Sequence, residues 1–182
     1  KINRIEFVPK DIEAQANVDI ALPIGYGQTI SQPLTVAFML ELLDPREGQK
    51  ILDVGTGSGW TTALLSEIVG EKGKVIAIER IRELVDFGKK NIDKFSYIKK
   101  GIAEVHYADG SLGYLDKAPY DRILVSAASP HIPASLKDQL KVGGKMVIPV
   151  GNSIIYLERN GEDKFYKEEY LGFNFVPLVI KE

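Results

Sequence analysis

Short apolar runs alternate with amphipathic stretches along most of this chain. The apolar runs predict buried β-strands, because strands covered on both faces read as continuous hydrophobic segments; they lie at residues 50–54, 74–79, 103–109, 120–128 and 144–150. Between them, apolar positions at helical spacing predict helices at residues 33–43, 60–70, 80–92 and 133–140. This alternation is typical of a doubly wound, Rossmann-like α/β fold, with a mostly parallel sheet between helices on both faces.

The pattern changes at both ends of the chain. Residues 1–30 have no clear period and contain several prolines and glycines, so we expect an ordered arm that lies over the body of the protein. Beyond Gly151, two strand-like segments flank Asn160-Gly161, which is a signal for a two-residue β-hairpin turn, and residues 174–180 predict one more strand. The sheet should therefore end in antiparallel C-terminal strands.

Length and the absence of internal boundaries point to one domain. The chain has 182 residues and no repeat, linker or low-complexity tract. We expect a single domain spanning residues 1–182, made of the arm (1–30), a core that binds the ligand (31–151) and a C-terminal hairpin with a final strand (152–182).

Composition narrows the classes of function. There are no cysteines, which excludes disulfides, thiolate metal sites and cysteine nucleophiles, and we expect no metal site. The formal net charge is −2, from 23 basic and 25 acidic residues without a basic stripe, which argues against a nucleic-acid partner. No apolar stretch approaches the ~20 residues that a membrane span needs, and the first residues lack the apolar centre of a signal peptide. We therefore expect a cytoplasmic protein, not bound to membranes, that acts on a small molecule or on another protein.

A glycine-rich loop, Asp53-Val-Gly-Thr-Gly-Ser-Gly, connects the strand at 50–54 to the helix after it. Glycines in this context let the backbone turn tightly and approach a ligand. Two acidic residues follow at the ends of the next two predicted strands: Glu79, suited to accept hydrogen bonds from ribose hydroxyls, and Asp109, suited to accept one from an adenine amino group. Because the ends of parallel strands meet at one edge of the sheet, these features predict a nucleoside site.

The spacing of the glycines narrows the choice of ligand. Gly55, Gly57 and Gly59 do not fit the Gly-x-Gly-x-x-Gly pattern of NAD-binding folds, and no Gly-Lys-Ser/Thr ending indicates a phosphate-binding loop. The loop instead resembles motif I of class I methyltransferases. That resemblance implies S-adenosylmethionine as cofactor, with Asp53 and the glycine turn facing its methionine part.

Many methyltransferases share a glycine loop of this kind, whereas other segments of the chain point to one family. The most specific are Thr29-Ile30-Ser31-x-Pro33 and the Pro-Val-Gly that ends at Gly151. With them, the chain is similar over nearly its whole length to the protein-L-isoaspartate O-methyltransferases, which methylate the abnormal carboxylate left by aspartate isomerisation or asparagine deamidation. The segments that carry the similarity are residues 7–11, 21–33, 52–60, 73–80, 108–114, 118–128, 136–151 and 175–179. The chain departs from the usual pattern at Asn17, where a tyrosine is common, and at Ser126, where threonine or glycine is usual.

The resemblance assigns roles to individual residues. Ser31 takes the active-site role, and Thr29 and Ile30 line the mouth beside it. The residues implied to contact S-adenosylmethionine are Gly55, Glu79, Asp109 and Gly110. The residues alone favour a different role for Ser31, as the N-cap of a helix that begins at Pro33, and the two roles are compatible.

The resemblance also implies the partners and the chemistry. The substrates would be damaged proteins and peptides that contain L-isoaspartyl or D-aspartyl residues. Methyl transfer to a carboxylate needs alignment and desolvation rather than a strong base, so Ser31 would orient the substrate, and His106 and His131 are expected to be structural or solvated. Two alternatives stay open: a methyltransferase with another substrate, such as tRNA, and a scaffold that binds the cofactor without turnover. The oligomeric state is not readable from the sequence.

Overall fold

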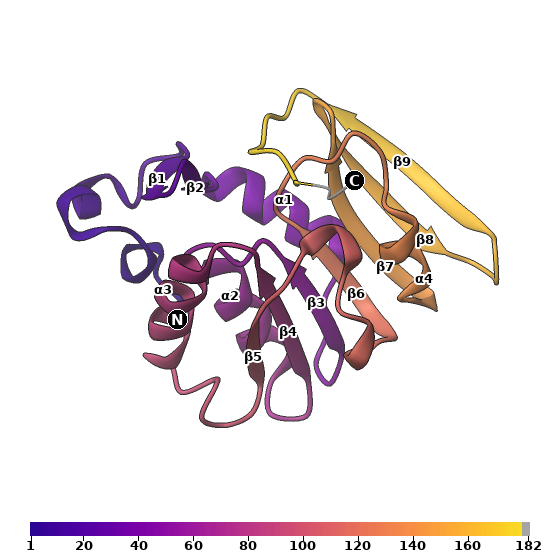
Figure 1. Cartoon of the computed structure of the whole chain (residues 1–182), viewed down its shortest axis with the longest axis horizontal. Helices are drawn as coiled ribbons and strands as arrows, with labels where there is room; N and C mark the ends of the chain where they lie inside the picture. Colours follow the sequence, from indigo (N-terminus) through magenta and orange to yellow (C-terminus); the bar gives the residue numbers. More distant parts are fainter. Residues whose placement is uncertain (180–182) are drawn as a thin grey trace.

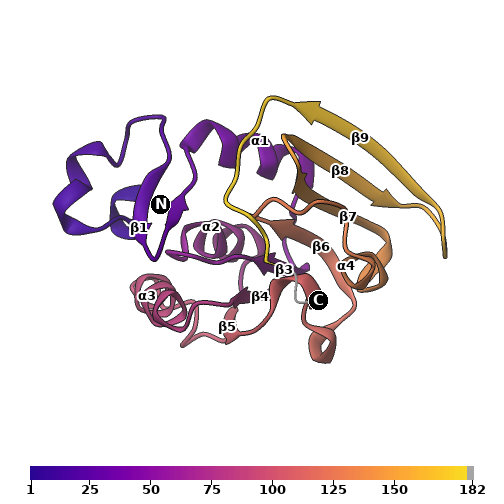
Figure 2. The same ribbon diagram turned by 45° about the horizontal axis from the view of Figure 1, so that its top comes forward.

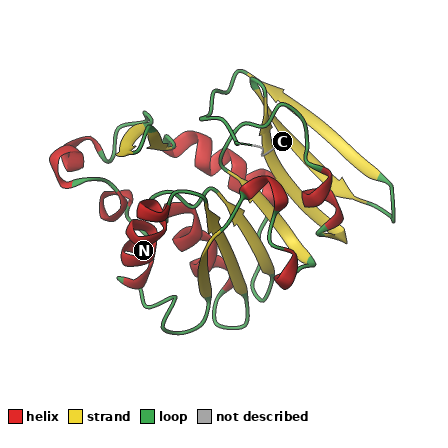
Figure 3. Cartoon of the chain, in the orientation of Figure 1, coloured by secondary structure: helices red, strands yellow, loops and turns green. Residues whose placement is uncertain are grey.

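A seven-stranded sheet forms the centre of the computed structural model, which describes residues 1–179 (Figures 1 and 3). Its strands follow the order β5-β4-β3-β6-β7-β8-β9. The first five strands in this order run parallel, whereas β8 and β9 are antiparallel to their neighbours, as the sequence predicts. The strand bounds are β3 (Lys50–Val54), β4 (Lys74–Glu79), β5 (Ala103–Tyr107), β6 (Tyr120–Val125), β7 (Leu140–Val150), β8 (Ser153–Arg159) and β9 (Phe165–Leu171).

Helices cover both faces of the sheet, but unequally. Alternate strand residues belong to two different hydrophobic clusters: Ile51 packs in the first, whereas Leu52 and Val54 pack in the second. The first cluster includes residues of α1 (Pro33–Leu43), α2 (Trp60–Val69) and α3 (Arg82–Asp93). The second face carries α4 (Ala134–Asp138) and the 3-10 turns η3 (Gly110–Leu112) and η4 (Leu115–Lys117). Among residues 1–179, no helix is long and apolar enough to cross a membrane.

The N-terminal arm is ordered, as expected, and packs on the first face (Figure 1, indigo). It consists of two 3-10 helices and a small antiparallel sheet: η1 (Arg4–Phe7), η2 (Lys10–Gln15), β1 (Leu22–Gly25) and β2 (Gln28–Ile30). Phe7, Ile24 and Ile30 belong to the same hydrophobic cluster as the large helices. The arm is therefore held by core packing and not only by surface contacts.

The C-terminal hairpin is present, but the predicted two-residue turn is wrong. Strands β8 and β9 pair from Arg159 opposite Phe165, so residues 160–164 form the connection. The backbone N–H of Asn160 donates to the carbonyl oxygen of Lys164 at 2.8 Å. The two-residue turn expected from Asn-Gly needs a positive φ at both positions, and neither Asn160 nor Gly161 has one.

The strand predicted at residues 174–180 is also wrong over the part that the structure describes; Ile180 lies outside it. The segment is irregular and makes one isolated bridge, between Pro177 and Ala128. Pro177 has no N–H to donate to a neighbouring strand, which confines proline to edges and irregular segments. Figure 2 shows this segment leaving β9 and crossing back toward the centre of the sheet, beside β3.

Candidate active site

A pocket opens at the carboxyl ends of the central strands β3, β4 and β6, and holds about 860 Å³ of empty space, counted out to its mouth. The loop after β3, the first turn of α2, the arm and the C-terminal segment 176–179 complete its walls. Strands β3 and β6 are neighbours although β4 and β5 lie between them in sequence, so the chain reverses its winding here. Ligands of open α/β sheets bind at such a reversal.

The glycine loop forms part of the pocket wall. Its glycines are required for different physical reasons. Gly57 has φ +52°, and a Cβ there would meet the side chain of Ile24 at 3.1 Å. At Gly59 a Cβ would stand 2.8 Å from Ile92, so this glycine permits close packing of α2 against α3. Gly55 and Gly57 line the pocket, whereas Gly59 does not. Contact between these two glycines and a cofactor stays a prediction.

Glu79, at the end of β4, is buried at 7% exposure and lines the pocket. One carboxylate oxygen accepts a hydrogen bond from the backbone N–H of Gly57 at 3.0 Å. The other accepts from the N–H groups of Arg80 and Ile81, at 2.7 and 3.0 Å. The carboxylate is therefore held rigidly against the glycine loop, with acceptor capacity left for a ligand, since a carboxylate has about four lone-pair sites.

Asp53 is completely buried below the loop and is not part of the pocket lining. Its Oδ2 accepts hydrogen bonds from the hydroxyl groups of Thr61 and Thr62, at 2.9 and 2.6 Å. Its Oδ1 is buried without a hydrogen-bond partner in the part of the chain that the structure describes. Burial raises the pKa of Asp53 to about 6, partly offset by the two hydroxyl donors.

Asp109 and Gly110 are neighbours in sequence but differ in their relation to the pocket. Gly110 lines it, and a Cβ there would lie 2.7 Å from Val54 and 3.1 Å from Leu178. The Oδ1 of Asp109 accepts from the backbone N–H and the hydroxyl of Ser111, so it caps the turn η3. Asp109 adjoins the pocket without lining it, and its contact with adenine stays a prediction.

The arm brings Thr29, Ile30 and Ser31 to the pocket, opposite the glycine loop. The N-cap role expected for Ser31 from local sequence is wrong. The cap position of α1 is Gln32, and the carboxylate of Asp19 accepts from the N–H of Leu34 at 2.8 Å. Within residues 1–179 the hydroxyl of Ser31 has no hydrogen-bond partner, so it is available to a ligand in the pocket.

Several lining residues were not singled out as ligand contacts from the sequence. Ser126 lies at the end of β6, and Val176–Val179 come from the crossing segment, which the sequence placed in the sheet. The proline inside that segment was the available signal against a strand. Trp60 lines the pocket and also packs in the core, at 8% exposure, with the guanidinium carbon of Arg4 5.5 Å from its ring centroid.

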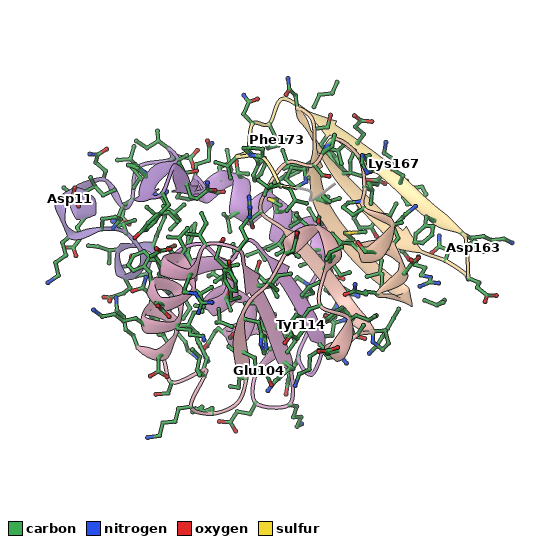
Figure 4. All side chains as sticks on the ribbon, in the orientation of Figure 1. Asp11, Glu104, Tyr114, Asp163, Lys167 and Phe173 are labelled. Carbon is green, nitrogen blue, oxygen red and sulfur yellow. The ribbon has the colours of Figure 1, made fainter. Side chains whose placement is uncertain are left out.

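The two histidines do not line the pocket. His106 lies on β5, and both of its ring nitrogens contact other side chains of the protein. Its Nε2 is 3.1 Å from a carboxylate oxygen of Glu104, and its Nδ1 is 3.1 Å from the hydroxyl of Tyr114. Figure 4 labels both partners, which lie over the lower part of the sheet in that view. His131 is exposed in a loop.

Comparison with known proteins identifies the family. The family model described as protein-L-isoaspartate (D-aspartate) O-methyltransferase matches residues 1–182. The chain belongs to the protein-L-isoaspartate O-methyltransferase family. Relatives of that name include one from Methanopyrus kandleri, 48% identical over 186 residues, which covers 100% of this chain and 81% of the relative. Another, from Archaeoglobus fulgidus, is 49% identical over 181 residues and covers 98% of this chain and 81% of the relative.

Solved structures agree with this family and with the Rossmann-like fold of its methyltransferases. A protein-L-isoaspartate O-methyltransferase superposes with a TM-score of 0.86 at 26% identity, over 97% of this chain and 58% of that one. A family member from Plasmodium falciparum, solved in complex with S-adenosyl-L-homocysteine, superposes with a TM-score of 0.84 at 25% identity, over 98% of this chain and 86% of that one. This chain thus spans somewhat over half the length of the first and most of the second.

Proposed function

We propose that this protein transfers a methyl group from S-adenosylmethionine to the free carboxylate of L-isoaspartyl and D-aspartyl residues in damaged proteins and peptides. One observation carries the proposal. The segment Thr29-Ile30-Ser31, which is particular to this family, lines the same pocket as Gly55, Gly57 and Glu79, and the Ser31 hydroxyl has no hydrogen-bond partner among residues 1–179. Substrate and cofactor segments, which lie apart in the sequence, therefore meet around one cavity.

The residues present fit S-adenosylmethionine. The Glu79 carboxylate, buried at the pocket wall, suits ribose hydroxyls, and Gly57 and Gly110 leave space that a side chain would fill. Asp53 lies below with an unpartnered oxygen, which suits a cationic amino group. When bound, the cofactor supplies an electrophilic methyl group on a positively charged sulfur, with a good leaving group behind it.

The protein itself has to bind and orient the second reactant. A carboxylate is already ionised at neutral pH, so no base is needed, and the site works by alignment and by excluding water. Within the described residues, the pocket lining has two charged side chains, Glu79 and the exposed Arg80. Ser31 is itself a neutral donor, and we expect its single hydrogen bond to orient the substrate carboxylate.

The test uses radiolabelled S-adenosylmethionine and two peptides that differ by isoaspartate or ordinary aspartate at one position. Base-labile transfer to the isoaspartyl peptide alone is the expected result. A Ser31→Ala variant should lower that transfer about tenfold and leave S-adenosyl-L-homocysteine affinity unchanged, because one hydrogen bond of about 1.4 kcal/mol is lost on the substrate side. Bound cofactor without transfer to the isoaspartyl peptide would contradict the proposal.

A further inference from the structure

The environment of Asp53 is unusual for a carboxylate. It has no exposed surface, yet both of its nearest polar partners donate to the same oxygen: Thr61 and Thr62 lie 2.9 and 2.6 Å from Oδ2. A buried, ionised carboxylate is costly unless it is well paired. Here one oxygen is doubly paired and the other, Oδ1, is left without a partner among residues 1–179.

We propose that Thr61 and Thr62 are positioning residues for cofactor binding: their hydroxyls keep Asp53 ionised and turned so that Oδ1 accepts from the ammonium group of the cofactor, with or without a bridging water. This inference rests on the proposed function, because it takes the cofactor to be S-adenosylmethionine. The two threonines lie in the first turn of α2, and Thr61 itself lines the pocket, so they connect the buried carboxylate to the cavity.

The hydroxyls of Thr61 and Thr62 matter because little else around Asp53 stabilises its ionised form. Burial is the largest influence on the pKa of Asp53 and raises it, the negative charge of Glu79 on β4 raises it further, and the hydroxyls of Thr62 and Thr61 lower it. On the glycine loop, the hydroxyl of Thr56 lies 3.5 Å from that of Thr62 and brings no charge. The side chains facing Asp53 therefore comprise two neutral donors and one repelling carboxylate.

These opposing influences on the pKa of Asp53 predict how cofactor affinity depends on pH. With a pKa of about 6, Asp53 is mostly ionised at neutral pH and becomes protonated just below it. A protonated Asp53 cannot accept well from an ammonium group, so cofactor affinity should fall as the pH drops through 6. Removing one threonine hydroxyl should raise the pKa of Asp53 further and move this fall to higher pH.

The experiment measures the affinity of the full chain for S-adenosyl-L-homocysteine by calorimetry between pH 5 and pH 8.5. For Thr62→Val, we expect affinity close to wild type above pH 8 and about tenfold weaker near pH 5, corresponding to a pKa raised by about one unit. Thr62→Ser should restore the wild-type profile. Thr61→Val, at a partly exposed position, provides a second variant if Thr62→Val does not fold, as judged by circular dichroism.

Ser66→Ala is the matched control. Ser66 is another buried hydroxyl of α2, but it donates to the backbone carbonyl of Thr62 at 2.7 Å and does not touch Asp53. Its pH profile should match wild type. A Thr62→Val curve that is weaker by the same factor at every pH would indicate a merely structural role and overturn the inference. Wild-type protein that binds no S-adenosyl-L-homocysteine at any pH would overturn the proposed function as well.

Discussion

At the scale of single residues, the site combines groups that are costly to bury with groups that make burial tolerable. Glu79 is satisfied by three backbone N–H groups, whereas within residues 1–179 Asp53 has hydrogen-bond partners on one oxygen only. A buried carboxylate whose pKa is raised, as that of Asp53 is, is typical of functional sites, because a group that is poised for a ligand is seldom the most stable choice for the fold alone. Asp53 should therefore show a conflict between stability and binding.

Asp53→Asn should stabilise the protein without its cofactor, and only at higher pH. The pKa of Asp53 is raised from 3.8 to about 6 on folding, so its contribution is fully favourable below pH 3.8 and is lost as the pH rises through 6. Above pH 7 the ionised group costs about 3 kcal/mol. The variant removes this cost but buries an unpaired amide, so we expect a gain of about 1–2 kcal/mol at pH 7.5.

Urea unfolding at pH 7.5 and pH 4 measures this difference. The gain should shrink or change sign at pH 4, where wild-type Asp53 is mostly protonated in the folded protein. The same variant should bind S-adenosyl-L-homocysteine more weakly. A variant that is equally destabilised at both pH values would show that ionisation of Asp53 carries no folding cost.

At the scale of elements, the arm is organised around one buried cation. Arg4, at the start of η1, is 4% exposed, and its guanidinium donates to five carbonyl oxygens. Three of these carbonyls belong to Ala16, Val18 and Ile20, in the middle of the arm. The other two belong to Ile30 and Ser31, at 3.3 and 3.1 Å. A side chain at the beginning of the chain thereby holds the backbone that carries the candidate catalytic hydroxyl.

Arg4→Met should loosen the arm at the active site. Five carbonyls lose a donor, two in buried hydrogen bonds and three in partly buried ones, so we expect the unfolding free energy to fall by about 2–4 kcal/mol in urea denaturation. The KM for an isoaspartyl peptide should rise more than the Kd for S-adenosyl-L-homocysteine, because Ser31 is displaced and the glycine loop is not. Lys94→Met is the control. Lys94, the C-cap residue of α3, is 39% exposed; its ammonium pairs with the carboxylate of Glu6 in the same arm at 3.2 Å and donates to the carbonyl oxygen of Glu6 at 2.6 Å. These exposed contacts together are worth about 1 kcal/mol. Similar effects of both variants would contradict a special role for Arg4.

At the scale of the whole molecule, two segments far apart in sequence, within residues 24–31 and 176–179, meet at the pocket. The arm supplies one wall, and the segment after β9 crosses back from the sheet edge to supply another (Figure 2). Backbone hydrogen bonds from Ala128 to Val176 and from Leu178 to Ala128 tie this segment to the loop after β6. Cofactor binding should therefore stabilise segments that are distant in sequence.

Hydrogen exchange with and without S-adenosyl-L-homocysteine tests this arrangement. At 100 times its Kd, a ligand adds about 2.7 kcal/mol against any opening that destroys its site. We expect slower exchange in the glycine loop and also at residues 28–31 and 176–178, apart from Pro177, which has no amide proton. The β8–β9 hairpin, away from the pocket, should exchange as before by local opening. Protection confined to the glycine loop would contradict the arrangement.

The core of the fold could be predicted because its signals are local. Strands β3 to β7 are short apolar runs, and the glycine loop carries its own turn chemistry, so each is readable within about ten residues. The hairpin was predicted correctly, but its two-residue turn was wrong. Asn160-Gly161 lies in a longer connection, because the pairing of Arg159 with Phe165 fixes where the two strands end. The prediction of a final strand was also wrong, because apolar character alone does not distinguish a strand from a segment that covers a pocket.

By itself, the sequence determined the strands and helices of the core, the glycine loop with Glu79 at the next strand end, and the family. Only the tertiary structure decided which side chains contact one another. It gave the cap of α1 to Asp19 and, among residues 1–179, left the Ser31 hydroxyl without a hydrogen-bond partner. It also paired Asp53 with two threonines and brought Arg4 and residues 176–179 to the same site. The physical reason is range: periodicity and turn chemistry act between near neighbours, whereas burial and hydrogen-bond partners depend on which distant segments the core brings together.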